Sequence, residues 1–193
     1  MGTMEKLLQR AMMMFCRREK SACQLAPVDF LQVAGDEVPR AVRYDRPLAL
    51  LMISIDGMSM IRKADGQPTS AVIFQTVALL FEDMMRQPDR IGRLGAGELG
   101  VLLPETSLTN AAAVGERLRR GVEALTIQTP AGARSVTLSV GVAAVTPRLR
   151  DPKTFLMRGC FELRRARSFG GNRVCVASAE KVRLTIPRNA KIH

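Results

Sequence analysis

The most constraining feature of the sequence is the segment RQPDRIGRLGAGELGVLLP at residues 86–104, in which two short apolar stretches flank the run GAGELG. This run matches the pattern G-x-G-x-x-G, which in dinucleotide-binding proteins lies between a strand and a helix whose N-terminus faces the pyrophosphate. Here the glycines lead directly into the extended residues VLLP, and no helix is expected before Pro104. The segment therefore predicts a β-hairpin with glycines at its tip and disfavours a Rossmann-type site.

The rest of the sequence interleaves helical and extended patterns around this hairpin. Apolar residues recur at helical spacing in four ranges, 28–44, 68–86, 107–125 and 152–168. Short apolar runs predict further strands at 47–55, 135–145 and 172–177. The residues ADGQP are expected to form a turn, with Pro68 at the first position of a helix. This order predicts an α/β fold, in which helices cover a mixed sheet.

The two ends of the chain are expected to lie outside the main domain. Residues 1–26 form a predicted helical extension, residues 27–178 the domain, and residues 179–193 a basic tail. The extension could equally pack on its own domain, form a dimer contact or lead to further sequence. No apolar run approaches the ~20 residues that a membrane span needs, and no signal peptide is recognisable, so we expect a cytoplasmic protein.

The amino-acid composition disfavours several kinds of catalytic, metal-binding and nucleic-acid-binding site. The four cysteines lack C-x-x-C spacing, which disfavours a zinc site or a disulfide framework, and the single histidine, His193, disfavours histidine catalysis. The net charge of +11 attracts polyanions, so nucleic acid, an anionic membrane face and a phosphorylated ligand are all compatible with it. Aromatic residues make up only 4%, fewer than expected for a protein that stacks bases on rings, so nucleic acid ranks last.

Four segments resemble successive landmarks of the GGDEF domain of the diguanylate cyclase family: RYDRPLALLMISID, RIGRLGAGELGVLLPET, SVTLSVGVA and ELRRARSFGGNRV. Their order and spacing agree from about residue 30 to residue 174. The resemblance implies a five-stranded, mostly antiparallel central sheet wrapped by helices, similar to adenylyl cyclase catalytic domains. It also implies a link to the bacterial second messenger cyclic di-GMP.

The same resemblance indicates a degenerate catalytic site. The family signature falls on Gly95, Ala96, Gly97, Glu98 and Leu99, so that Gly97 replaces a metal-binding carboxylate. A second metal-binding aspartate is replaced by Ser54, which leaves Asp56 as the only acid of that strand.

Groups that would bind GTP are replaced as well. The guanine-reading positions fall on Arg62 and Ala71, a phosphate-facing lysine position on Arg167, and a following arginine position on Gly171. We therefore expect no cyclase activity, no catalytic residue, no metal ion and no cofactor.

A second family motif is retained. Arg86 to Asp89 form R-x-x-D, which ends five residues before the signature and in the family marks an inhibitory site for the product. An arginine can donate two parallel hydrogen bonds to a phosphate or to the guanine edge. The resemblance adds Arg117, which often acts on a neighbouring domain, so binding can pair two protomers. The expected ligand-binding residues for cyclic di-GMP are Arg86, Asp89, Arg90 and Arg117.

The motif alone is weak evidence, because residues 62–65 and 148–151 match it too and an exposed Arg–Asp pair contributes little. Its register against the hairpin, together with Arg117, favours ligand binding. We therefore predict an inactive cyclic di-GMP receptor that acts on an unidentified effector protein, with a homodimer as a further possibility. The alternative is a protein interaction scaffold of the same fold that binds no nucleotide.

Overall fold

A single sheet forms the centre of the computed structural model, which describes residues 24–146 and 150–177. Its strand order is β1-β3-β4-β2-β7-β8. The central strand β2 (Leu48–Ile55) pairs antiparallel with β4 (Glu98–Pro104) and with β7 (Leu138–Ala144). Beyond them, β3 (Arg90–Arg93) pairs antiparallel with β4, and β8 (Arg173–Val176) pairs parallel with β7.

The five-stranded, mostly antiparallel sheet predicted from the sequence is confirmed. A two-residue strand, β1 (Gln24–Leu25), extends it by pairing parallel with β3. Every residue of β2 is buried, because helices cover both faces of the strand. This burial explains why its sequence, LALLMISI, is apolar almost throughout and does not alternate.

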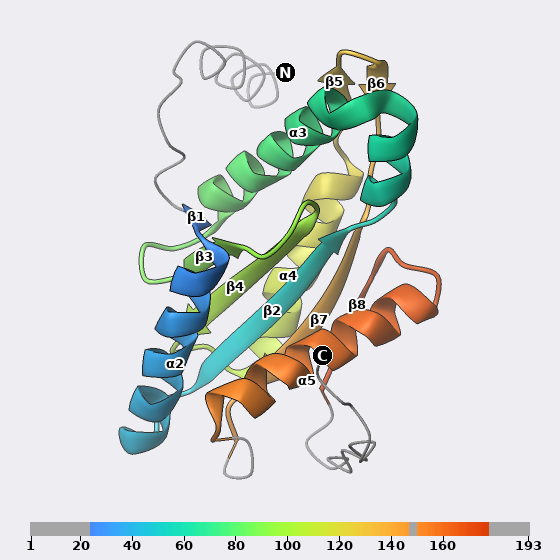
Figure 1. The fold of residues 1–193 in the computed structure, drawn as a ribbon. Helices are drawn as coiled ribbons and strands as arrows, with labels where there is room; N and C mark the ends of the chain where they lie inside the picture. Colours follow the sequence, from blue (N-terminus) through green and yellow to red (C-terminus); the bar gives the residue numbers. More distant parts are fainter. Residues whose placement is uncertain (1–23, 147–149, 178–193) are drawn as a thin grey trace, which may run out of the picture.

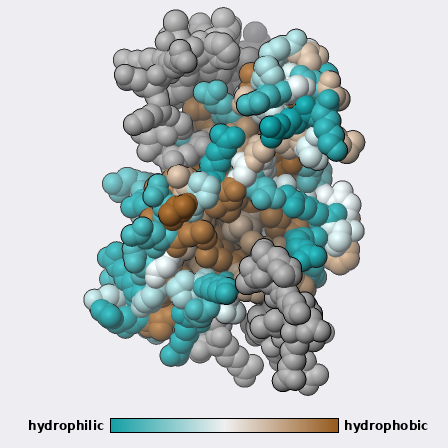
Figure 2. All heavy atoms as spheres, viewed as in Figure 1, coloured by the Kyte–Doolittle hydropathy of each residue, from teal (hydrophilic) through white to brown (hydrophobic). Residues whose placement is uncertain are grey.

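The helices cover the sheet in pairs (Figure 1). On one face, α3 (Met58–Met84) and α4 (Leu108–Glu123) pack on the core that contains Leu51 and Val140. On the other face, α2 (Pro27–Arg43) and α5 (Pro152–Ser168) pack on a second core that contains Leu50 and Leu102. Figure 2 shows hydrophobic residues gathered between α2 and α5 on this second face.

Glycines allow the second face to pack closely. A methyl group on Gly141 would lie 2.1 Å from the backbone nitrogen of Leu163, so α5 rests directly on the backbone of β7. The ring of Phe30 similarly fills the space above Gly92 and Gly100, where added methyl groups would lie 2.4 Å and 2.5 Å from its atoms. The positions of α2 and α5 over the sheet therefore depend on the absence of side chains at these glycines.

The structure differs from the sequence prediction at two places. Helix α3 begins at Met58 and not at Pro68, and the expected turn is a kink at Gly66, whose φ of 83° and ψ of 175° are non-helical. A short hairpin of β5 (Ile127–Thr129) and β6 (Gly132–Arg134) was not predicted, and β7 begins at Leu138 and not at residue 135. Residues 1–23 of the predicted helical extension lie outside the described residues, and its last residues contain the strand β1. Within the described ranges, no helix is long and apolar enough to cross a membrane.

Candidate functional site

The signature residues lie at the tip of the β3–β4 hairpin, beside the end of β2. The strand register places Glu98 directly opposite Ser54. Arg167, in the last turn of α5, donates hydrogen bonds to Glu98 Oε1 at 2.7 Å and to Ser54 Oγ. The one carboxylate retained in the signature is therefore already paired with a cation of the same chain.

The third signature position has no room for a side chain. A methyl group on Gly97 would lie 2.8 Å from both Cβ and Cγ of Met58, the first residue of α3. Real Cβ atoms essentially never approach another heavy atom so closely, and the atoms of Met58 concerned are next to its backbone. Met58 thus packs against the position at which the resemblance to the GGDEF family predicts a metal-binding carboxylate.

Asp56, the acid left on this strand, is engaged in hydrogen bonds to three neighbours. Its Oδ2 accepts from Thr137 Oγ1 at 2.7 Å and from the Asn172 backbone N–H at 3.0 Å, and its Oδ1 accepts from Ser139 Oγ at 2.7 Å. These contacts join the end of β2 to β7 and to the turn before β8. The geometry gives Asp56 the role of a structural acceptor, with both oxygens occupied.

A cavity of about 770 Å³, which we call the signature cavity, opens beside these groups. It is lined by residues 55–59, where β2 ends and α3 begins, by the hairpin residues 96–98 and by three cations, Arg62, Lys63 and Arg167. Magnesium prefers several carboxylate or carbonyl oxygens, and the donors here do not fit it. Within the described part of the chain, no group of three or more His, Cys, Asp or Glu residues could hold a metal ion.

Cys160, on α5, lies close enough to Glu98 and Arg167 for both charges to affect the pKa of its thiol. Burial raises the pKa of the Cys160 thiol, Glu98 raises this pKa further, and Arg167 lowers it. Because the net shift is upward, the thiol stays protonated near neutral pH. Cys160 is therefore a poor nucleophile in this structure.

The R-x-x-D residues form the turn between α3 and β3. Asp89 Oδ2 accepts a hydrogen bond from the Arg86 backbone N–H at 2.9 Å, and its Oδ1 lies 3.7 Å from Arg86 Nη2. The Arg86 side chain is 63% exposed, whereas that of Asp89 is only 3% exposed. Oδ1 of Asp89 is buried and has no hydrogen-bond partner among the described residues. The turn thus places Oδ1 of Asp89, a buried acceptor that receives no hydrogen bond from the described residues, beneath the exposed guanidinium group of Arg86.

Four further hydrogen bonds fix this turn and the residues beside it. Arg86 Nη2 donates to Thr106 Oγ1 at 3.0 Å, and the buried Thr106 hydroxyl donates to the Pro104 carbonyl at 3.0 Å. Arg90 Nη1 donates to the carbonyls of Gln87 and Asp89 at 2.9 and 3.1 Å. The guanidinium groups of Arg86 and Arg90 are therefore both anchored beside the Asp89 turn.

Arg86 and Arg90 border a second cavity, of about 290 Å³, which we call the arginine cavity. Arg40 from the end of α2 and Arg46 from the loop before β2 also line it, together with Glu37 and Glu105. Sequence reasoning missed Arg40 and Arg46. The signal that could have found them is the antiparallel pairing of Leu48 with Pro104, which brings the start of β2 to the end of β4.

Arg117 lies against the same segment of chain but in a different place. Its Nη2 donates to the carbonyl of Met84, two residues before Arg86, at 3.1 Å. Arg117 does not line the arginine cavity. The structure therefore brings Arg86, Asp89 and Arg90 together. It places Arg117 in contact with Met84, outside the arginine cavity.

Comparison with protein families shows similarity over most of the chain. Residues 29–173 match the model described as "Diguanylate cyclase, GGDEF domain". Diguanylate cyclase A of Treponema denticola is 32% identical over 130 residues, 67% of this chain and 35% of the relative. The response regulator PleD of Caulobacter vibrioides is 29% identical over 139 residues, 71% of this chain and 31% of the relative. The chain thus spans about a third of the length of these curated relatives.

Solved structures share the fold at lower sequence identity. The active GGEEF domain of a diguanylate cyclase from Vibrio cholerae superposes with a TM-score of 0.75 at 21% identity, covering 80% of this chain and 97% of that one. The GGDEF domain of DgcB from Caulobacter crescentus, in complex with c-di-GMP, superposes with a TM-score of 0.76 at 19% identity, covering 84% and 97%. At these identities the superpositions establish the fold alone.

Proposed function

The chain belongs to the GGDEF diguanylate cyclase domain family, and from this premise we propose that it is a catalytically inactive receptor for cyclic di-GMP. In this proposal the dinucleotide binds at Arg86 and Asp89, and binding changes the contact with another protein. A ligand can act in this way only through a difference in its affinity for two states of the protein.

The loss of catalysis is supported by what occupies the signature site. Joining two GTP molecules needs metal ions that neutralise developing phosphate charge. Here Arg167 bonds to Glu98 and Ser54, while Met58 packs against Gly97. Because the metal-binding carboxylates are missing and the remaining one is paired, we propose that the domain needs no magnesium ion or other cofactor.

The observation that carries the binding proposal is Oδ1 of Asp89, which is buried beneath the exposed side chain of Arg86 and accepts no hydrogen bond among the described residues; Arg86 Nη2 lies 3.7 Å away, in an ion pair too long for a hydrogen bond. A buried acceptor without a donor is costly, so such an atom suggests a missing partner. The N1–H and amino groups of guanine are donors of the required kind. Since Asp89 is almost covered, we infer that Arg86 moves off Thr106 to a phosphate or to guanine O6 and N7 when the ligand binds.

The charge of the arginine cavity also suits a dianion. Four arginines, Arg40, Arg46, Arg86 and Arg90, face two glutamates, Glu37 and Glu105. Glu105 is already paired with Arg46, and Glu37 with Arg40. The cavity therefore carries a net positive charge at the point where the phosphates of cyclic di-GMP would lie.

Isothermal calorimetry with cyclic di-GMP on the wild type and on Arg86→Ala tests the site. A bidentate arginine–guanine contact contributes ~1–3 kcal/mol, so we expect Arg86→Ala to weaken binding by roughly tenfold or more. The matched control is Arg62→Ala, which removes an exposed arginine from the second R-x-x-D sequence and should bind as the wild type does.

Two outcomes would contradict the proposal. Absence of heat with the wild-type protein would favour the interaction scaffold, which keeps the fold and binds no nucleotide. Equal binding by the wild type and Arg86→Ala would show that the dinucleotide binds elsewhere.

A further inference from the structure

The phenylalanines in the described part of the chain form two groups, one with buried and one with exposed side chains. Among the described residues, Phe30, Phe74, Phe81 and Phe155 are buried. Two others are exposed, Phe161 at 47% and Phe169 at 55%, and both belong to the same helix, α5, and its C-cap. Exposing large apolar side chains costs free energy, so two exposed rings on one helix suggest a surface that is covered by a partner.

Each exposed ring lies beside a guanidinium group. The guanidinium carbon of Arg158 is 5.6 Å from the centre of the Phe161 ring. Those of Arg165 and Arg173 are 5.8 Å and 6.0 Å from the centre of the Phe169 ring. Arginine and aromatic groups thus alternate along α5 and onto β8, a surface that we call the α5–β8 face and define by Phe161, Phe169, Arg164, Arg165 and Arg173.

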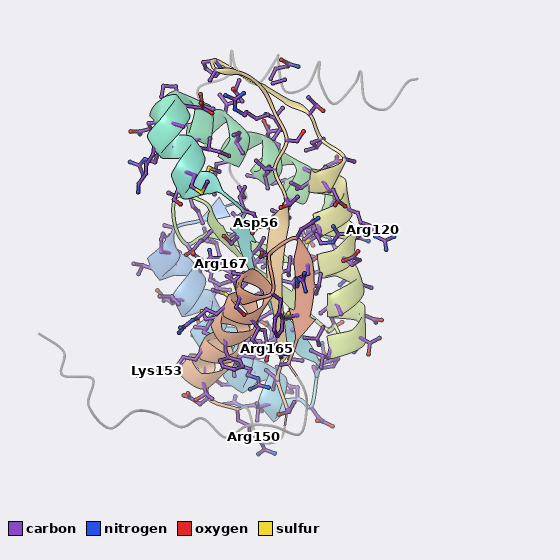
Figure 3. All side chains as sticks on the ribbon, turned by 90° about the vertical axis from the view of Figure 1, so that its right-hand side faces the viewer. Asp56, Arg120, Arg150, Lys153, Arg165 and Arg167 are labelled. Atoms are coloured by element: carbon purple, nitrogen blue, oxygen red, sulfur yellow. The ribbon has the colours of Figure 1, made fainter. Side chains whose placement is uncertain are left out.

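This part of the chain is also strongly basic. Residues 150–177 contain seven Lys or Arg residues but only two acids, Asp151 and Glu162. Glu162 is fully buried and paired with arginines of the same helix, and Asp151 caps the helix N-terminus. Exposed Arg164 and Arg173 form no ion pair with any described residue. Figure 3 shows Lys153, Arg165 and Arg167 around α5, with Arg150 just before it.

We propose that the α5–β8 face binds single-stranded nucleic acid, with bases stacking on Phe161 and Phe169 and phosphates contacting Arg164, Arg165 and Arg173. Sites of this kind combine a basic surface with aromatic rings and neighbouring arginines. The two rings are eight residues apart on the helix, or roughly 12 Å along its axis, so one strand of several nucleotides can reach both. An apolar peptide anchor would need a pocket, and neither ring lines the signature cavity or the arginine cavity.

Fluorescence anisotropy of a labelled oligothymidylate of about 20 nucleotides, longer than a site of ~4–16 nucleotides, tests this surface. The full chain should bind it, and the affinity should fall as salt is raised, with a slope of ~0.7 per phosphate contacted. Replacing both rings, in Phe161→Ala/Phe169→Ala, should weaken binding by roughly tenfold for each ring. Because each ring is about half exposed, this variant should lose some stability but remain folded at 25 °C, which circular dichroism would check.

Two matched variants make the result specific. Phe161→Leu/Phe169→Leu keeps apolar area but removes the rings, and it should lose as much affinity as the alanine variant. Tyr44→Ala removes an equally exposed ring, 60% accessible, at the end of α2 and should bind as the wild type does. Vesicles containing phosphatidylserine serve as a second polyanionic probe.

Several results would overturn the proposal. The first is that the wild-type protein does not bind the oligonucleotide. The second is that the wild type and the double alanine variant bind it equally, which would assign the interaction to basic residues elsewhere on the protein. Full binding by the leucine variant would show that stacking is not involved. Loss of vesicle binding by the alanine variant without loss of oligonucleotide binding would assign the face to a membrane surface.

Discussion

At the scale of single residues, Gly97 shows why one reverse mutation should not recreate a cyclase. The side chain of an aspartate at this position would begin 2.8 Å from Cβ and Cγ of Met58. Overpacking of this kind costs ~1–3 kcal/mol, so Gly97→Asp should lower the free energy of unfolding by about that amount. Adding Met58→Ala should recover part of the loss, which urea unfolding would measure.

The same variants test the inactivity of the domain. We expect neither the wild type nor Gly97→Asp to form cyclic di-GMP from GTP with Mg²⁺ or Mn²⁺, because Arg167 still pairs with Glu98 and the residue opposite Glu98 is the uncharged Ser54. Product above a no-enzyme control from the wild type would contradict the proposed function. A Gly97→Asp protein as stable as the wild type would contradict the packing argument.

At the scale of elements, an ion-pair network should make the docking of α4 pH-dependent. Arg119 donates to Glu116 at 2.8 and 2.9 Å, to Glu123 at 2.8 Å and to Asn172, before β8, at 2.7 Å. The hydrogen bond from Arg119 lowers the pKa of Glu116 from 4.5 to about 2; burial opposes the shift, and Arg120 adds to it.

A carboxylate with a lowered pKa stabilises the folded state above its unfolded pKa, and this stabilisation is lost as the pH falls. For Glu116 the loss should occur between about pH 4.5 and about pH 2. Glu116→Gln should therefore cost up to ~1 kcal/mol at neutral pH, the upper value for exposed pairs, and flatten the pH dependence in this range. Urea unfolding at several pH values measures this, with Asp36→Asn as an exposed control. A pH profile parallel to that of the wild type would contradict the prediction.

Helices whose first and last turns contain typical capping and terminal residues could be predicted from the sequence. Helix α5 was expected at residues 152–168 and is found there, with Asp151 as its N-cap, Pro152 in its first turn and arginines in its last. The start of α3 has no such signal, because Gly57 at its N-cap offers no side chain, and Gly66 interrupts it after two turns. The strands β5 and β6 have three residues each, too few for a periodic pattern.

At the scale of the whole molecule, the candidate sites depend on strand order as much as on motifs. The register of Arg86 and Asp89 against the hairpin could be predicted because both lie within twelve residues of the signature. Arg40 and Arg46 could not, since they reach the arginine cavity only because β2 pairs with β4. The pairing of Arg167 with Glu98 likewise requires α5 to lie across the sheet beside the hairpin.

The same strand order separates the two proposed binding surfaces and makes their independence testable. The arginine cavity borders the starts of β2 and β3 and the end of β4, whereas the α5–β8 face lies at the β8 edge of the sheet. From β3, which directly follows the turn that contains Arg86, to β8 there are four strand spacings, or about 19 Å, at ~4.8 Å for each spacing. Charges this far apart are largely screened at ~0.1 M salt, where the Debye length is ~10 Å.

We therefore expect each variant to affect only its own ligand. Arg86→Ala should bind the oligonucleotide within about twofold of the wild type, and Phe161→Ala/Phe169→Ala should do the same with cyclic di-GMP, since additivity holds for sites more than ~7–10 Å apart. Saturating cyclic di-GMP should leave oligonucleotide anisotropy unchanged. Displacement of the oligonucleotide by cyclic di-GMP in the wild type, but not in Arg86→Ala, would contradict this expectation and show that the two surfaces are coupled. The dinucleotide bound at the arginine cavity would then favour a state of the protein in which the α5–β8 face cannot bind the oligonucleotide.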